Sequence, residues 1–233
     1  KRIGEQFSAQ DSGTLSIATT HTQARYVLPV PVAKLRETYP KVNVSLHQGS
    51  PDQVARMVIE EVAEIGIATE SLADYAELVT LPCYEWQHVL VLPPGHPLAA
   101  RARLTLEDIA EHPLITYHPS FTGRTRIDHA FAAKKLQPRI ALEAIDSDVI
   151  KTYVRLGLGV GIVAEMAVKD DPVQDLLVRP LGPLLGMNVA RVAFKRGAYL
   201  RHFVTQFAEL LSERLTAPLV ARAMSGQAND YEL

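Results

Sequence analysis

The chain has 233 residues, 47% of them hydrophobic, and a mean hydropathy of +0.03, which is globular composition at a length that favours two domains. Lysine and arginine number 24 against 26 acidic residues, so the formal net charge is −2. These values exclude a broad basic surface that would bind the phosphate backbone of a nucleic acid.

The segment from Thr14 to Ala68 predicts a β-α-β-α-β order. The apolar residues Leu28, Val32 and Leu35 recur at helical spacing, although two nearby prolines, Pro29 and Pro31, predict an irregular first half for that helix. The next helix has a strong start signal at 50–53, where Ser50 and Gln53 form a capping-box pair around a proline. The predicted strands are 14–20, 42–46 and 64–68, with helices between them ending near Tyr39 and Glu61.

The same order returns after two β-prone runs at 78–81 and 88–92 and a short helix at 106–110. Gly157 is expected to end the second helix of this cycle. The predicted elements are strands at 114–117, 139–143 and 160–164, with helices at 122–136 and 148–156. A last strand at 188–194 and one helix follow, and residues from about 217 onward are expected to be frayed. The sequence therefore predicts two α/β domains.

Polar residues gather where strands of each predicted domain end and helices begin. In open α/β sheets, ligands bind outside the carboxyl ends of the strands. Hydroxyl and amide groups there would surround a small oxyanion with neutral donors, assisted by backbone N–H groups of a helix start. The candidates are Thr20, Thr22, Gln23 and Thr69 in the first domain and Thr122 in the second, with His21 as a further candidate donor. The alternative is that these threonines only cap helices and form turns.

Residues 13–215 resemble the effector-binding part of LysR-type transcriptional regulators, and in particular those that control cysteine biosynthesis and sulfur assimilation. The resemblance rests on ATTHTQARYVLP, GIATE, LPCYEWQH and YHPSFTGR, in this order along the chain. It implies two Rossmann-like lobes of the periplasmic-binding-protein type II kind, joined by two crossover strands. It also implies these bounds: 1–12, the end of a linker helix; 13–84 and 188–215, lobe I; 85–187, lobe II; 216–233, a flexible tail.

By the same resemblance, the four threonines and Gln23 hold a sulfate-like anion in a cleft between the lobes. The implied inducer is similar to N-acetylserine, which derives from O-acetylserine. Trp86 lies beside an expected hinge, where packing is its ordinary role and a part in the inducer response is the alternative. No cofactor, metal or membrane contact is expected. The family implies a cytoplasmic regulator, a homodimer of this fragment and a homotetramer of the full-length protein, with DNA bound only by a winged helix-turn-helix domain that this chain lacks.

Three other hypotheses compete with the inducer sensor. A close paralogue could report sulfur limitation through adenylylsulfate. An extracytoplasmic sulfate-binding protein of a transporter would share the fold. A two-lobed transferase would need a residue for proton transfer or covalent chemistry, and the predicted cleft offers none clearly. The eight histidines show no pair at the spacing of metal ligands on a helix, and Gly157–Gly161 lies between a helix and a strand, the wrong order for a dinucleotide-binding loop. We therefore expect no enzyme activity.

Overall fold

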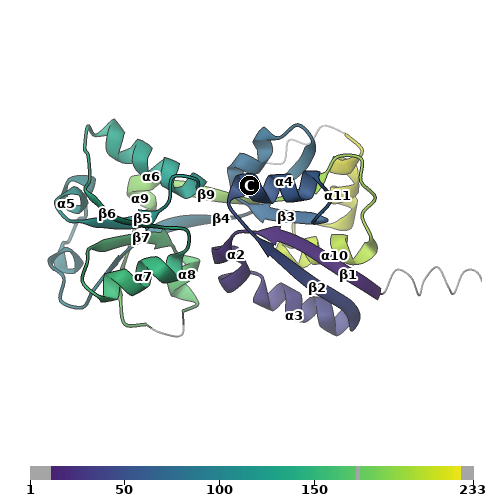
Figure 1. The fold of residues 1–233 in the computed structure, drawn as a ribbon, viewed down its shortest axis with the longest axis horizontal. Helices are drawn as coiled ribbons and strands as arrows, with labels where there is room; N and C mark the ends of the chain where they lie inside the picture. The colour runs from purple at the N-terminus through teal and green to yellow at the C-terminus, as the bar shows by residue number, and fades with distance from the viewer. Residues whose placement is uncertain (1–11, 172–173, 227–233) are drawn as a thin grey trace, which may run out of the picture. The chain divides into compact units, whose positions relative to one another are not determined.

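The computed structural model describes residues 12–171 and 174–226, which form two α/β units (Figure 1). Unit 1 comprises the chain up to Glu85 and from Val189 onward, and unit 2 is Trp86–Asn188. Two strands carry the chain from one unit to the other: β4 (Leu78–Leu92) and β9 (Met187–Lys195). None of the helices in the described residues is long and apolar enough to cross a membrane.

Unit 1 contains a sheet in the order β2-β1-β3-β9 with helices on both faces. Strand β1 runs parallel to β2 and β3, and β9 is antiparallel to β3. The larger core lies between one face of this sheet and the helices α3 and α10. A smaller core lies between the other face and α4. The elements are β1 (Ser12–Thr19), α2 (His21–Tyr26), α3 (Pro29–Thr38), β2 (Lys41–Gln48), α4 (Pro51–Ile59), β3 (Ile65–Ala68), η1 (Glu70–Asp74), α10 (His202–Leu211) and α11 (Ala217–Met224).

Unit 2 has the corresponding order β4-β7-β5-β6, with β8 paired to β4. Strands β6, β5 and β7 are parallel, and β4 is antiparallel to β7. One core holds Ile127 and Phe131 of α6, and the other holds Ile150 and Val154 of α7. The elements are η2 (Pro97–Ala100), α5 (Leu106–Ala110), β5 (Leu114–Tyr117), α6 (Thr122–Ala133), β6 (Ile140–Ala144), α7 (Ser147–Arg155), β7 (Val160–Ala164), α8 (Met166–Lys169), β8 (Leu177–Pro180) and α9 (Gly182–Leu185).

Local sequence signals explain several boundaries. The capping box that begins α4 is confirmed: the Gln53 backbone N–H donates to Ser50 Oγ over 3.4 Å, and the Ser50 backbone N–H donates to Gln53 Oε1 over 2.9 Å. Gly157 follows α7 with φ +77°, a left-handed conformation that favours glycine. The predicted helix 106–110 and strands 114–117 and 160–164 are confirmed.

Other predictions need correction. The helix expected up to Tyr39 is two helices, because Pro29 and Pro31 both lie in the first turn of α3, where a missing N–H costs no helical hydrogen bond. The two runs at 78–81 and 88–92 are parts of the single strand β4. For the linker helix expected at 1–12, residues 1–11 lie outside the described residues, and Ser12 begins β1.

The flexible tail predicted for 216–233 is wrong over its first part. Residues Ala217–Met224 form α11, which Thr216 caps by accepting a hydrogen bond from the Leu219 N–H. Leu219, Val220 and Ala223 are buried in the core of unit 1. Residues 227–233 lie outside the described part of the chain.

Candidate functional site

In unit 1, two of the predicted donors lie at one edge of the sheet. Strands β1 and β3 are parallel neighbours, with Thr19 opposite Ile67. Thr20 follows the end of β1 and Thr69 follows the end of β3, so both lie at the same edge of the sheet. Thr19 has a different role, because its hydroxyl donates to the Ile67 carbonyl over 3.0 Å inside the sheet. The parallel pairing thus brings together residues that are far apart in the sequence.

The threonines at this edge are not explained by helix capping alone. Thr20 is the N-cap residue of α2 and is 8% exposed, yet its side chain makes no capping hydrogen bond. Thr69 is also buried, and its hydroxyl lies 3.3 Å from that of Ser71. Thr22 and His21 lie partly buried in the first turn of α2. Because α2 has only six residues, its dipole is small, and the side chains contribute more than the dipole to the binding of an anion.

Gln23 is held in place by a tyrosine that the sequence analysis missed. The Tyr84 hydroxyl, on β4, donates to the amide oxygen of Gln23. Burial raises the pKa of Tyr84 well above its ordinary value, so the hydroxyl remains a donor at neutral pH. With its oxygen engaged, Gln23 has its NH2 group as the donor on the other side of the amide.

Arg124, the last residue of the motif YHPSFTGR, is neutralised by carboxylates. Arg124 donates to Asp128 and to Glu143 over 2.7 Å each, and to the Tyr117 carbonyl over 2.8 Å. Burial opposes the charge of this guanidinium, but the two carboxylates outweigh it and the net pKa is raised. Arg124 is therefore a structural residue of unit 2.

The predicted donor of unit 2, Thr122, is the first residue of α6, and its side chain lies outside the described part of the structure. Two other side chains come close to this helix start. A Cβ atom on Gly123 would lie 2.9 Å from Nε2 of His88 and 3.8 Å from the ring of Trp86. Both residues project from the same face of β4, because strand residues two apart do so.

Trp86 and His88 are buried, and each has an unsatisfied nitrogen. Trp86 is 5% exposed and His88 is 0% exposed, and their rings meet edge to face with centroids 4.9 Å apart. Neither Trp86 Nε1 nor His88 Nε2 has a hydrogen-bond partner among the described residues. Such atoms are rare in folded proteins, and each one needs an explanation.

His88 is neutral in the folded domain. Burial, and secondarily the charge of Arg126, lowers its pKa to about 3. The Asn188 amide nitrogen lies 3.3 Å from Nδ1 of the ring and 3.5 Å from the Trp86 carbonyl oxygen. Histidine spacing alone does not single out His88, although the alternation Tyr84, Trp86, His88 in a β-prone run signals one shared strand face.

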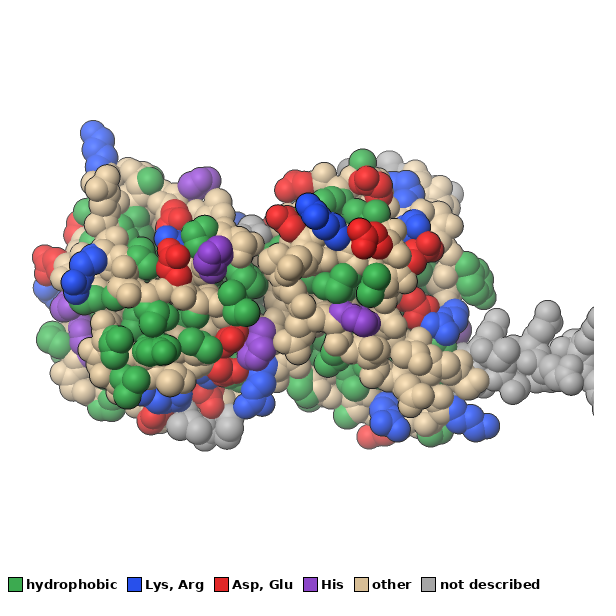
Figure 2. Space-filling model, viewed as in Figure 1, with side chains coloured by type: hydrophobic (Ala, Val, Ile, Leu, Met, Phe, Trp, Pro, Cys, Tyr) green, Lys and Arg blue, Asp and Glu red, His purple; other side chains and the backbone are tan. Residues whose placement is uncertain are grey.

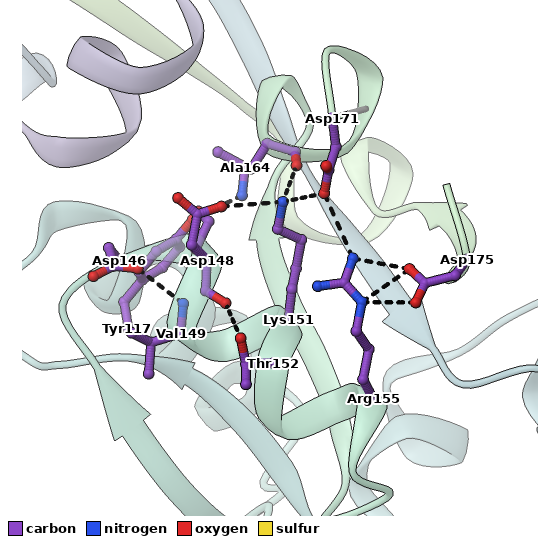
Figure 3. Close-up of polar contacts among 12 residues, drawn as sticks. Tyr117, Asp146, Asp148, Val149, Lys151, Thr152, Arg155, Ala164, Asp171 and Asp175 are labelled. Carbon is purple, nitrogen blue, oxygen red and sulfur yellow. Dashed lines mark hydrogen bonds and ion pairs between the residues drawn. The ribbon is translucent and has the colours of Figure 1, made fainter. Parts of the chain in front are cut away.

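Unit 2 also contains a cavity of about 480 Å³ between β4, α7 and α8, and none of the predicted site residues lines it. Two of its cations, Lys151 and Arg155, are paired within the protein (Figure 3). Lys151 is buried and contacts Asp171, Asp148 and the Ala167 carbonyl, and Arg155 contacts Asp175 over 2.8 Å. We assign no ligand to this cavity, because Lys151 and Arg155 already have carboxylate partners.

Comparison with known proteins identifies the family. The model of the LysR substrate binding domain matches residues 8–216. The chain belongs to this LysR family. It is 54% identical to the HTH-type transcriptional regulator CysB of Burkholderia cenocepacia over 233 residues, which are 100% of this chain and 74% of that protein. It is 43% identical to the HTH-type transcriptional regulator cbl of Escherichia coli K12 over 236 residues, covering 100% of this chain and 75% of that one.

A solved structure gives the same result for the fold. The cofactor-binding domain of the Cbl transcriptional regulator aligns with a TM-score of 0.87 and 45% identity, covering 91% of this chain and 93% of that one. The chain thus has the two-lobed α/β fold of LysR effector-binding domains, as its sequence predicts. The relatives in this comparison are transcriptional regulators.

Proposed function

We propose that this LysR-family domain senses a small anionic effector for a cytoplasmic transcriptional regulator of cysteine biosynthesis and sulfur assimilation. The proposed ligands are sulfate and an inducer similar to N-acetylserine or O-acetylserine. The similarity to CysB and Cbl supports the regulatory role. The observation that carries the ligand class is the set of buried, neutral donors at the strand ends of unit 1, chiefly Thr20, Thr69 and Gln23.

These donors suit a compact oxyanion on energetic grounds. A hydrogen bond to a charged group contributes about 1.5–3 kcal/mol. Several such bonds, reduced by the cost of immobilising the ligand, correspond to dissociation constants from roughly micromolar to millimolar. That range suits a sensor of a metabolite pool, since the occupied fraction then follows the metabolite concentration.

The other parts of this function depend on the full-length protein. We propose that DNA is contacted by a winged helix-turn-helix domain outside this chain, that this chain forms a homodimer, and that the full-length protein is a homotetramer in which the effector shifts the population of states. The domain has no catalytic role in this proposal. An extracytoplasmic sulfate-binding protein would share the fold, but the 54% identity to a transcriptional regulator favours the sensor.

Replacing Thr22 by valine tests the ligand assignment. We expect about a tenfold loss of affinity for sulfate or N-acetylserine, equivalent to about 1.4 kcal/mol, because valine keeps the shape of threonine and removes the hydroxyl donor. Isothermal titration calorimetry measures this loss, and Thr122→Val should give a similar one. Thr38→Val, at an exposed position of α3, is the matched control for Thr22, and Thr125→Val, exposed on α6, is the control for Thr122. Unchanged affinity for both ligands in both site variants would refute the assignment.

A further inference from the structure

The two unsatisfied nitrogens of unit 2 point to a binding role that goes beyond the threonines. An indole Nε1 always carries a hydrogen and can only donate. A buried donor without an acceptor is unfavourable, so its presence in a folded protein suggests that a ligand or water supplies the acceptor. The same question applies to His88, whose Nε2 is buried beside Trp86.

Asn188 determines which nitrogen of His88 carries the hydrogen. Its amide nitrogen lies near both the Trp86 carbonyl oxygen and His88 Nδ1. A carbonyl oxygen can only accept, so the NH2 group of Asn188 faces these two atoms and donates to Nδ1. In a neutral imidazole one nitrogen accepts and the other donates. His88 Nε2 is therefore an N–H donor.

This donor faces the start of α6. Gly123 is the second residue of that helix, and a Cβ there would approach His88 Nε2 to 2.9 Å. The first backbone N–H groups of an α-helix have no acceptor within the helix, and α6 has twelve residues. The Arg124 N–H donates to the Phe121 carbonyl, so the backbone donors of this turn are the N–H groups of Thr122 and Gly123, and Gly123 lies against His88 Nε2. Among the described residues, no acceptor is bonded to His88 Nε2 or Trp86 Nε1.

We propose that His88, Trp86 and the first turn of α6 form a donor-only subsite, which binds a fully deprotonated oxyanion group of the effector and discriminates against oxyanions that keep a proton. His88 is the specificity-determining residue of this subsite. The proposal rests on the proposed function and names the residue that sets its anion specificity. Sulfate offers only acceptors, whereas hydrogen phosphate carries an O–H that would need an acceptor, and neither N–H group can provide one.

Burial keeps His88 neutral, so its ability to distinguish sulfate from hydrogen phosphate does not change with pH in the neutral range. Its pKa of about 3 keeps the imidazole in one state throughout the neutral range, so the ring binds by a directed hydrogen bond and adds no formal charge. A protonated histidine would attract any anion, with or without a proton. A neutral donor distinguishes between them by hydrogen-bond complementarity.

The experiment compares sulfate and inorganic phosphate by calorimetry on the whole chain, at a slightly acidic pH where phosphate keeps a proton. We expect sulfate to bind at least about tenfold more tightly. His88→Phe keeps a buried ring without the donor and should reduce sulfate affinity about tenfold. His88→Gln restores an N–H donor and adds an acceptor, so it should regain sulfate binding while narrowing the difference from phosphate. His129→Gln, at an exposed position of α6, is the matched control.

A measurement on the unaltered chain does not depend on how the variants fold. Trp86 is the only tryptophan, so its indole N–H gives one unambiguous proton resonance. Sulfate should shift this resonance and that of the His88 imidazole N–H. If sulfate binds but leaves both resonances and the His88→Phe affinity unchanged, the subsite is refuted and the proposed function stands. If the chain binds neither sulfate nor N-acetylserine, both proposals fail.

Discussion

At the scale of single residues, the candidate donors of the domain are neutral groups. Arg124 is paired with two carboxylates, Gln23 is fixed by Tyr84, and His88 is held neutral. Neutral donors in a buried environment bind an anion through hydrogen bonds whose geometry is fixed before the ligand arrives. Tyr84 and Asn188 therefore orient the donor groups of their own units.

His88 should also make the stability of the domain depend on pH. Its pKa is about 3 in the folded chain and near 6.5 in the unfolded chain, so below pH 6.5 only the unfolded chain takes up the proton. The free energy of unfolding should fall as the pH is lowered from 6.5 towards 3, by at most about 1.4 kcal/mol per pH unit from this residue. Above pH 6.5 both states are neutral and His88 contributes no slope.

Urea unfolding at several pH values measures this slope. His88→Gln should flatten it in that window, and His129→Gln, which alters an exposed histidine, should leave it as in the unaltered chain. A slope that is the same with and without His88 would contradict the assignment of a buried, neutral imidazole.

At the scale of elements, the correction at α11 has a consequence for stability. Val220 is fully buried and Leu219 nearly so, which means that this helix contributes to the core of unit 1. Leu219→Ala should lower the free energy of unfolding by about 2 kcal/mol, at the low end for buried leucines because Leu219 is 8% exposed. Denaturant unfolding measures the loss, with the exposed Arg222→Ala of the same helix as the control. Equal stability of the two variants, together with rapid hydrogen exchange throughout 217–224, would favour a frayed tail.

Periodicity and capping predicted most elements because those signals are local. The capping box at Ser50, the run at 160–164 and the glycine after α7 each depend on neighbours in the sequence. Helix α11 was missed because its eight residues follow a short turn after α10 and show a small apolar face, which only the tertiary core makes meaningful. Strand β8 was missed because its side chains are largely exposed and its pairing with β4 is not local.

Some residues of the candidate site could likewise be predicted from local signals, and others could not. The ends of β1 and β3 were predictable, since the order of parallel strands places Thr20 and Thr69 at one edge. The roles of Tyr84, His88 and Asn188 were not. Each depends on a contact across long sequence separation: Tyr84 with Gln23, and Asn188 with His88. Composition and spacing carry no signal for an orphaned nitrogen, which is a property of the packed structure.

At the scale of the whole molecule, both units expose apolar side chains among charged ones (Figure 2). Val30 of α3 is 62% exposed and Leu46 of β2 is 41% exposed in unit 1. In unit 2, Ile145 is 62% exposed and Val149 of α7 is 39% exposed. Single exposed apolar residues are ordinary on protein surfaces. Their presence on both units gives a dimer apolar contacts to bury.

We expect the chain to be a homodimer of about 51 kDa, twice its mass of 25.7 kDa. Analytical ultracentrifugation measures this mass directly. Val30→Asp and Val149→Asp should each shift the population towards 25.7 kDa, because burying an unpaired carboxylate in an apolar interface is unfavourable. Leu177→Asp, on the edge-exposed strand β8, tests whether any exposed apolar residue has this effect, and it should leave the dimer intact. A mass of 25.7 kDa for the unaltered chain at the concentrations used for calorimetry would overturn the expectation, and effector binding would then have to act through each monomer alone.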